Sequence, residues 1–238
     1  MPRTNKTSEA KVQAIFDRIS TTYDATNSAI SLGMHKRWRK KTMAQLPLES
    51  SGTALDLCCG TGDWTIDLAQ VVGSTGKVVG LDFSKNMLEI AEKKAEQADV
   101  AQQTSLIQED AMALPFVNNS FDVVTIGFGL RNVPDASRVL SEMQRVVKPG
   151  GMVACLETSQ PQNKLIYPFW NLYFKIVPLI AKMKHNDTKD YVYLQKTTKE
   201  FFNAKELEKL FQSVGLTDTT YQTFLFGAAA LHTGSKNS

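Results

Sequence analysis

The 238-residue sequence has few cysteines and histidines, and this scarcity limits the metal and redox chemistry that it can support. There are three of each, and two of the cysteines, Cys58 and Cys59, are adjacent. Structural zinc sites and thiol redox sites use C-x-x-C pairs or His/Cys clusters, and the sequence has neither. We therefore predict no metal site, and we interpret the adjacent cysteines as small apolar residues at the end of a buried strand.

Strong charge and an uninterrupted apolar run are also missing. The net charge of +3 is too small to indicate nucleic acid as a partner. The first 13 residues are polar and lack the apolar centre of a secretory signal, so we expect a cytoplasmic protein. The apolar stretch 165–183 contains Lys175, Pro168 and Pro178, which makes it a poor transmembrane span.

Short apolar runs alternate with helical patterns through the middle of the chain, which predicts a mostly parallel sheet in a doubly wound α/β fold. The predicted strands are 53–59, 77–83, 104–108, 121–128 and 152–158. We expect one domain, 1–238, of four parts: an N-terminal helical cap (1–46, with helices over 8–23 and 34–46), a ligand-binding core (53–158), a substrate- or membrane-facing insertion (159–203), and a C-terminal helix and antiparallel hairpin (204–238).

A glycine turn and a carboxylate follow the first two predicted strands. Gly60 and Gly62 in "DLCCGTGDW" allow a tight turn whose backbone N–H groups can approach a ligand closely. Asp82 ends the next predicted strand, about 20 residues further on, where a carboxylate can bind both hydroxyls of a ribose. Because ligands of such folds bind beyond the carboxyl ends of the strands, this pairing predicts an adenosine-containing ligand.

The residues around the turn distinguish between adenosine ligands. Thr65 stands where a dinucleotide fingerprint has its third glycine, and Asp63 would repel a pyrophosphate at the helix N-terminus. S-adenosylmethionine fits better, since Asp56 and Asp63 could face its ammonium or sulfonium group. We expect Asp110 to end the third strand, where its carboxylate and the backbone of Ala111 could hold the adenine amino group.

Several longer motifs resemble the ubiquinone/menaquinone biosynthesis C-methyltransferases. They include "VQAIFDRISTTYDATNSAISLGMHKRWR", "LDLCCGTGD", "SFDVVTIGFGLRNV", "EMQRVVKPGG" and "YVYLQKTTKEFF", and "CCGTGDW" most resembles demethylmenaquinone methyltransferases of Gram-positive bacteria. The resemblance covers nearly the whole chain and implies a Rossmann-like, S-adenosylmethionine-dependent methyltransferase of menaquinone biosynthesis. The cofactor positions that it implies are Thr61, Asp82, Asp110, Ala111 and Gly127.

The resemblance also implies the reaction, which is methylation of a ring carbon of a prenylated quinol. The carbon becomes nucleophilic when a neighbouring hydroxyl loses its proton, and a cation nearby would stabilise the resulting oxyanion. Arg131 and Asn132 follow the fourth predicted strand. We assign oxyanion stabilisation to Arg131 and substrate orientation to Asn132, with the alternative that Arg131 only fixes its loop through a carboxylate. Tyr23 is a candidate lid residue over the cofactor.

A prenylated substrate implies contact with a membrane surface. The aromatic stretch 165–183 suits an interface or a prenyl-binding wall, and equally a buried cap over the site. The basic run 35–41 could touch anionic lipid at the inner face of the cell membrane. A homodimer is left open. The alternative functions are methylation of another small molecule, such as a benzoquinol, sterol or phenol, and a cofactor-binding module without turnover.

Overall fold

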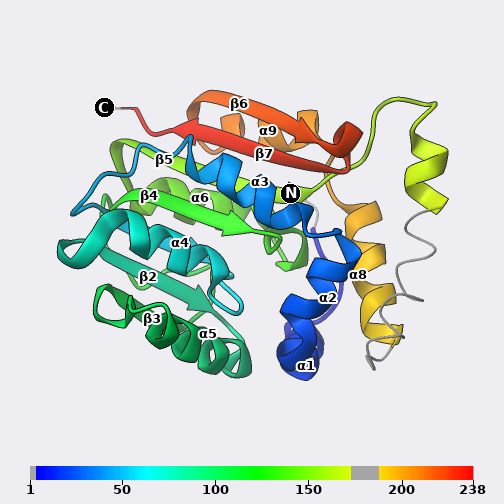
Figure 1. Ribbon diagram of the computed structural model, residues 1–238. Helices are drawn as coiled ribbons and strands as arrows, with labels where there is room; N and C mark the ends of the chain where they lie inside the picture. The colour runs from blue at the N-terminus through cyan, green and yellow to red at the C-terminus, as the bar shows by residue number, and fades with distance from the viewer. Residues whose placement is uncertain (1–3, 173–187, 238) are drawn as a thin grey trace.

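The computed structural model describes residues 4–172 and 188–237, which form one seven-stranded sheet between layers of helices (Figure 1). Neighbouring strands follow the order β3-β2-β1-β4-β5-β7-β6. The first five strands are parallel, and β7 is antiparallel to both of its neighbours. The strands are β1 (Thr53–Leu57), β2 (Lys77–Asp82), β3 (Thr104–Gln108), β4 (Phe121–Gly127), β5 (Val147–Thr158), β6 (Thr217–Phe224) and β7 (Ala229–Ser235).

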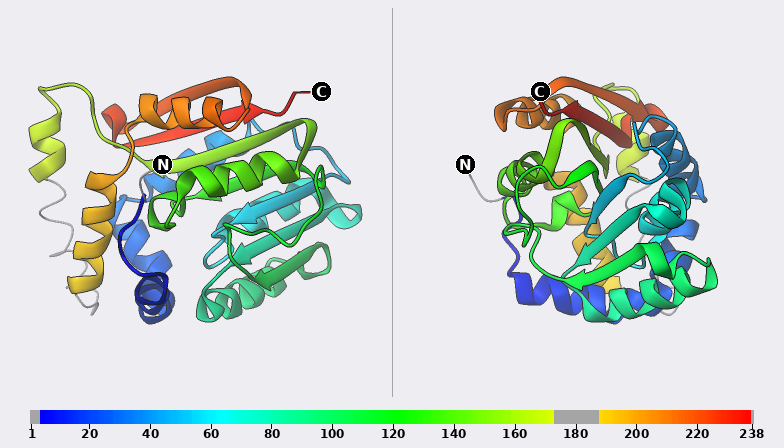
Figure 2. Two further views of the ribbon diagram at one scale, coloured as in Figure 1. Left: turned by 180° about the vertical axis from the view of Figure 1, so that it is seen from behind. Right: turned by 90° about the vertical axis from the view of Figure 1, so that its left-hand side faces the viewer.

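Helices cover both faces of the sheet, as Figure 2 shows from behind and from the side. The longer helices are α1 (Glu9–Ile19), α2 (Tyr23–Ile30), α3 (Met34–Met43), α4 (Asp63–Val72), α5 (Lys85–Gln97), α6 (Ala136–Val146), α8 (Thr188–Glu200) and α9 (Ala204–Ser213). One hydrophobic cluster joins α6 and α9 to the sheet, and a second joins α4 and α3 to its other face. The predicted doubly wound fold with a C-terminal hairpin is confirmed.

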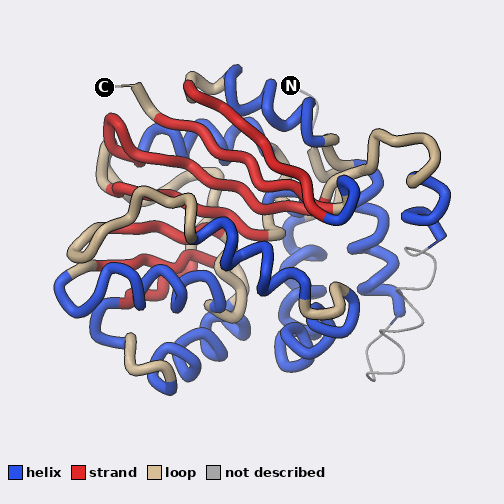
Figure 3. Tube along the Cα trace, turned by 45° about the horizontal axis from the view of Figure 1, so that its top comes forward, coloured by secondary structure: helices blue, strands red, loops and turns tan. Residues whose placement is uncertain are grey.

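The helical cap lies at the carboxyl ends of the parallel strands, where Figure 3 shows α1, α2 and α8 side by side. The helix predicted over 8–23 ends at Ile19, and a 3₁₀ turn (Ser20–Thr22) leads into α2, which the sequence pattern did not predict. Helix α1 turns Val12, Ile15 and Phe16 into a third cluster. The cap therefore covers the edge of the sheet at which ligands of such folds bind.

Two local predictions can be compared directly with the structure. Asn203 and Glu206 form the predicted capping box at the start of α9. Strand β5 begins five residues earlier than predicted, at Val147, because Val147 pairs with Phe121 and a register shift before the Val123–Met152 pair accommodates the Pro-Gly-Gly segment as an irregularity within the strand. The aromatic stretch 165–183 is described only to residue 172, with helical residues 167–172, and the rest of that prediction lies outside the described residues.

Candidate active site

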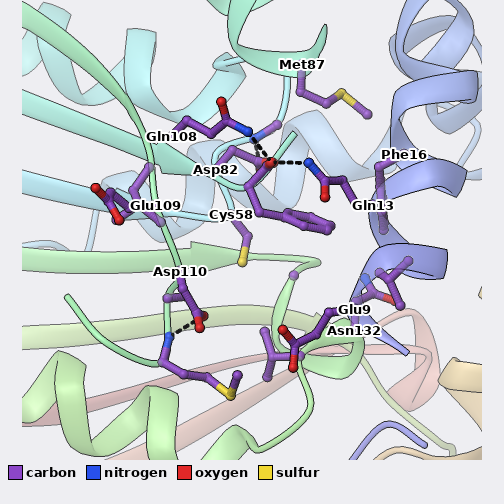
Figure 4. Close-up of a pocket in the computed structure, with 18 of the residues that line it drawn as sticks. Glu9, Gln13, Phe16, Cys58, Asp82, Met87, Gln108, Glu109, Asp110 and Asn132 are labelled. Carbon is purple, nitrogen blue, oxygen red and sulfur yellow. Dashed lines mark hydrogen bonds between the residues drawn. The ribbon is translucent and has the colours of Figure 1, made fainter. Parts of the chain in front are cut away.

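A cavity of about 340 Å³ opens between the carboxyl ends of β1 to β4 and the cap helices α1 and α2 (Figure 4). A smaller cavity of about 70 Å³ lies beside it, toward α3 and the start of α4. Residues of both cavities include most of the positions that the sequence singled out. Those present are Tyr23, Asp56, Gly60, Thr61, Asp63, Asp82, Asp110, Ala111, Gly127 and Asn132.

The β1–α4 turn requires its glycines. Gly60 and Gly62 have φ angles of 55° and 79°, in the left-handed region that other residues rarely adopt. A Cβ atom on Gly62 would also lie 2.8 Å from the Cβ of Ala91, so this glycine permits the close packing of α4 on α5. The turn and the first residues of α4, Asp63 and Trp64, line the smaller cavity, next to the first-turn N–H groups that have no partner within a helix.

Asp82 joins the glycine turn to the end of β2. Its carboxylate accepts hydrogen bonds from the backbone N–H groups of Gly60 and Ser84, both at 2.9 Å. The side chain is 5% exposed, and burial raises the pKa of Asp82 to about 6. These bonds fix both carboxylate oxygens at the wall of the larger cavity, where each has a lone pair left for a ribose hydroxyl.

Asp56 lies deeper, at the wall of the smaller cavity. It accepts hydrogen bonds from the hydroxyl groups of Thr65 (2.8 Å) and Thr125 (2.9 Å), and burial raises its pKa to about 7. No cation is bonded to it in the described part of the chain. Its position beneath the turn is compatible with the predicted contact to an ammonium group, and the contact itself stays a prediction.

Asp63, by contrast, is engaged in an ion-pair network. It pairs with Arg39 of α3 at 3.1 Å and with Lys94 of α5. Burial alone would raise the pKa of Asp63, but the hydrogen bond from Lys94 and the charge of Arg39 lower it. Lys94 also pairs with Asp24 of α2 at 2.8 Å. Asp63 therefore ties the cap to the core, and its carboxylate is compensated by these cations rather than free for the ligand.

The loop after β3 forms the opposite wall. Asp110 is exposed, and its Oδ1 atom accepts the backbone N–H of Met112 at 2.8 Å in a tight turn, while Ala111 is buried. Asp110 stands two residues beyond the end of β3 rather than at the strand end. Asp110, Gln108 and Glu109 all line the larger cavity, and in Figure 4 the Asp110 carboxylate lies on the far side of Cys58 from Gln108.

The cap contributes residues that sequence reasoning missed. Gln13 of α1 and Gln108 of β3 both donate to the backbone oxygen of Phe83, at 2.9 and 3.0 Å, as Figure 4 shows. Phe16 lines the same cavity, and its ring packs edge-on against Phe83 and Tyr23. The available signal was Gln13 itself, a polar residue next to Val12 on the apolar face of α1.

Arg131 and Asn132 occupy different positions in the loop after β4. Asn132 lines the larger cavity, and its side-chain oxygen accepts a hydrogen bond from Tyr193 of α8 at 3.2 Å. The guanidinium of Arg131 instead points to Glu157 (2.6 Å) and to the backbone oxygen of Phe128 (2.6 Å). Arg131 is not among the residues that line the larger cavity. This arrangement favours the alternative in which Arg131 fixes its loop through a carboxylate.

The cysteines differ in their surroundings: Cys155 belongs to a hydrophobic cluster, Cys58 packs against that cluster and also lines both cavities, and Cys59 lines the smaller cavity. Cys155 is fully buried in β5, and Cys58 and Cys59 follow β1, half-buried. Burial raises the pKa of each thiol well above its usual value, which disfavours the reactive thiolate. In residues 4–172 and 188–237 no group of three or more His, Cys, Asp or Glu side chains is arranged to hold a metal ion.

A parallel sheet of this order, a glycine turn bound to Asp82 and a cavity at the strand ends define the class: an S-adenosylmethionine-dependent methyltransferase of the doubly wound type. Solved structures share the fold. One is a SAM-dependent methyltransferase from Thermotoga maritima (TM-score 0.66, 20% identity, covering 95% of this chain and 100% of that chain). Another is a Haemonchus contortus phosphoethanolamine N-methyltransferase in complex with S-adenosylmethionine (TM-score 0.64, 17% identity, 85% of this chain and 53% of that chain).

Within this class, the chain belongs to the ubiE/COQ5 methyltransferase family, whose model matches residues 4–236. Similar proteins include the demethylmenaquinone methyltransferase of Lactiplantibacillus plantarum, with 50% identity over 95% of this chain and 96% of the relative. The corresponding protein of Bacillus licheniformis is 52% identical over 96% of this chain and 97% of its own length. The predicted family and the S-adenosylmethionine-dependent methyltransferase activity are confirmed.

Proposed function

We propose that this chain transfers the methyl group of S-adenosylmethionine to a ring carbon of a prenylated demethylmenaquinol, giving menaquinol. The observation that carries the proposal is the cavity bounded by Asp82 at one end and Asn132 at the other, in a chain half identical to demethylmenaquinone methyltransferases. The cavity continues from the carboxylate toward an apolar wall with Val133 and Pro134, which suits a quinol ring next to an adenosyl group.

Each cavity residue then has a role toward the cofactor. Asp82 binds the ribose hydroxyls, Asp110 and Ala111 hold the adenine, and the turn through Gly60, Thr61 and Gly62, with Asp56 beneath it, receives the methionine end. Gly127 lines both cavities, and it must be small because a Cβ there would meet the Trp64 ring at 2.8 Å. Tyr23 covers the cofactor from α2, where it lines both cavities. Bound S-adenosylmethionine supplies the electrophilic methyl group.

The loop after β4 serves the acceptor. Asn132 is the candidate for orienting the quinol, because its amide is fixed by Tyr193 and lies at the cavity. Arg131, bound to Glu157, acts as a positioning residue for this loop, and oxyanion stabilisation by its remaining N–H groups is the second candidate role.

One assay tests the proposal against its alternatives. Purified protein with S-adenosylmethionine labelled in the methyl group is given demethylmenaquinol, a benzoquinol precursor, or a sterol or phenol. Label transfer to demethylmenaquinol alone, or most rapidly, is the expected result. Transfer only to another acceptor would identify a different methyltransferase, and cofactor binding without any transfer would indicate a module without turnover.

Because the proposed substrate is prenylated, we also expect the protein to have a surface that contacts the membrane. No helix in the described residues is long and apolar enough to cross a bilayer. Leu165, Phe169, Leu172 and Phe226 are exposed apolar side chains, with Phe169 and Phe226 73% and 74% exposed. The two segments that carry them, residues 165–172 and the turn between β6 and β7, lie on the side of the molecule where the parallel strands end (Figure 1). Nearby α3 carries exposed lysines, and Lys41 lies over the ring of Phe224. The proposed partner is the anionic inner face of the cell membrane.

Vesicle sedimentation tests this surface. The double variant Phe169→Ser, Phe226→Ser should bind phosphatidylglycerol vesicles at least several-fold less than the parent, because exposed aromatic area drives interfacial binding. Val117→Ser is the matched control, since Val117 is 79% exposed but precedes β4 at the other end of the sheet. Equal binding by all three proteins would contradict the assignment. A homodimer remains a prediction to which no surface is assigned.

A further inference from the structure

The two cavities meet at a junction that includes two aromatic residues, Tyr23 and Phe128, and Phe128 has as yet no role in the site. Five residues line both cavities: Tyr23, Cys58, Gly60, Gly127 and Phe128. The larger cavity contains the ribose carboxylate Asp82, and the smaller contains Asp56 and Thr61. In S-adenosylmethionine the sulfonium sulfur joins the adenosyl group to the methionine chain. A cofactor whose two ends occupy these cavities therefore places its positive charge at the junction.

Phe128 is held in a conformation that its own side chain disfavours. Its φ of 55° lies in the left-handed region, which is uncommon for a residue with a bulky side chain. The neighbouring residues must be small: a Cβ on Gly127 would meet Trp64 at 2.8 Å, and one on Gly129 would meet Cys58 at 2.4 Å. The Gly-Phe-Gly segment thus has space for one side chain only. That side chain is the Phe128 ring, which packs, partly buried, against the hydrophobic cluster of α3 and α4 in a residue that lines both cavities.

Three hydrogen bonds hold the backbone of Phe128 in place. Its N–H donates to the carbonyl of Leu156 at 2.8 Å. Its carbonyl accepts from Nη1 of Arg131 at 2.6 Å and from Nδ2 of Asn132 at 3.3 Å. A disfavoured backbone conformation persists only where its surroundings over-determine it, and such residues gather at ligand sites.

The guanidinium of Arg131, which binds the Phe128 carbonyl, is itself held in place by a carboxylate. Nη1 of Arg131 binds Oε1 of Glu157 at 2.6 Å, and the Arg131 N–H binds Oε2 of the same carboxylate at 3.2 Å. Glu157 is 1% exposed and also accepts the N–H of Thr158 at 2.6 Å. The Arg131–Glu157 pair connects the loop after β4 to the end of β5, so it fixes the Phe128 carbonyl relative to the sheet. Burying an ion pair contributes little net stability, because the cost of removing both charges from water offsets their attraction. We therefore attribute the Arg131–Glu157 pair to positioning of the Phe128 backbone.

We propose that Phe128 determines the preference of the site for the positively charged cofactor over its neutral product, and that the Glu157–Arg131 pair positions it for this task. The face of an aromatic ring attracts a cation, and the attraction is larger where water is excluded. When the methyl group leaves, the sulfonium becomes an uncharged thioether, and S-adenosylhomocysteine loses this attraction. The site therefore holds the donor more tightly than the product that must leave.

Binding measurements on the whole protein test the proposal without any turnover. Calorimetric titration of Phe128→Leu with S-adenosylmethionine and with S-adenosylhomocysteine compares a cation and a thioether of nearly the same shape. The donor should lose about fivefold in affinity, as expected for one cation–π contact, while the product changes less than twofold. Equal losses for the two ligands, or no loss for the donor, would overturn the proposal.

Two further variants separate charge recognition from simple shape. Phe128→Trp retains an aromatic face and should keep or increase the donor preference, which tests the proposal even where the leucine variant folds poorly. Phe83→Leu is the matched control, because Phe83 lines the larger cavity only. It should alter the affinities for both ligands together. A Phe83 variant that changes the donor-to-product ratio as much as Phe128→Leu would contradict the assignment.

Glu157→Gln tests the positioning step. The glutamine keeps the shape of the side chain and removes the charge that fixes Arg131. The donor-to-product affinity ratio should fall toward that of Phe128→Leu, whereas a purely structural Glu157 would lower the melting temperature and leave the ratio unchanged. The inference rests on S-adenosylmethionine as the ligand. If the parent protein binds neither ligand, that assignment fails; if it binds both and all variants keep its ratio, only the role of Phe128 fails.

Discussion

At the scale of single residues, the site depends on a carboxylate that is costly to bury. Asp82 has its pKa raised to about 6 because it is withdrawn from water, and two backbone N–H groups partly compensate. Asp82→Ala should weaken S-adenosylmethionine binding by about 10- to 100-fold, since hydrogen bonds to a charged group contribute roughly 1.5–3 kcal/mol. Calorimetric titration measures the loss, and circular dichroism verifies the fold.

A second carboxylate provides the control for Asp82. Asp122 accepts hydrogen bonds from Thr53 and Lys148 near the start of β4, at the opposite edge of the sheet from the cavity. Asp122→Ala should lower stability without changing cofactor affinity. Unchanged affinity in a folded Asp82→Ala protein would refute the ribose assignment.

His232 predicts a pH dependence of stability. It is buried in β7, where one ring nitrogen bonds the carbonyl of Ala204 at 2.7 Å, and burial lowers its pKa to about 4. Because the folded-state pKa lies below the unfolded value of about 6.5, the neutral ring contributes stability above pH 6.5. That contribution, about 3 kcal/mol, is lost as the pH falls from 6.5 to 4.

Replacing the ring isolates this effect. His232→Gln can retain a hydrogen-bond donor to Ala204 and cannot be protonated in this range. Denaturant unfolding at pH 8, 6 and 4.5 should therefore show a smaller loss of stability for the variant than for the parent. The comparison at pH 8, where both side chains are neutral, gives the cost of the altered packing. Parallel curves for the two proteins would contradict the role of His232.

At the scale of elements, the close approach of α4 and α5 depends on Gly62. Its φ is 79°, and a Cβ at this position would lie 2.8 Å from that of Ala91, so an alanine is both strained and in collision. Gly62→Ala should cost about 2–4 kcal/mol of unfolding free energy. Gly150→Ala is the control, because Gly150 has a similar φ of 76° with no neighbour within 4 Å, and it should cost about 1–2 kcal/mol. Equal costs would show that packing at Gly62 is unimportant.

Among the helices and strands, the sequence predicted most of the parallel strands but not the break in the first helix. Strand–helix alternation predicted β1 to β4 to within two residues, because buried parallel strands are continuous apolar runs. The break after Ile19 was not predicted, since Ser20–Thr22 interrupts a helical pattern without glycine or proline. Asp63 and Arg131 were identified as site residues by their place after a strand. In the structure Asp63 pairs with Lys94 and Arg131 pairs with Glu157. Because both partners are distant in the sequence, the sequence pattern could not indicate that these charges are already paired.

At the scale of the whole molecule, the cap is joined to the core by charges that cross between helices. Lys94 of α5 pairs with Asp24 of α2 and with Asp63 of α4, and Arg39 of α3 pairs with Asp63 and with Asp67 (2.5 Å). Asp24, Arg39 and Asp63 of this network line the smaller cavity, so the ion pairs hold the cap helices over the part of the site proposed for the methionine end of the cofactor. The side chains are partly exposed, and salt therefore screens their attraction.

This network predicts a salt-dependent release of the cofactor. Lys94→Met removes the cation shared by α2 and α4, and it should speed S-adenosylmethionine dissociation by about two- to fivefold at low salt, as expected for about 0.5–1 kcal/mol of partly exposed ion pairing. Raising the ionic strength should speed release from the parent toward the rate of the variant and change the variant little. Lys85→Met is the matched control, because Lys85 lies on the same helix and pairs only with Glu89 at 3.9 Å among the ion pairs of the described residues. Stopped-flow displacement at low and high salt measures all three rates, and an equal salt response in the parent and Lys94→Met would show that the network does not hold the cap closed.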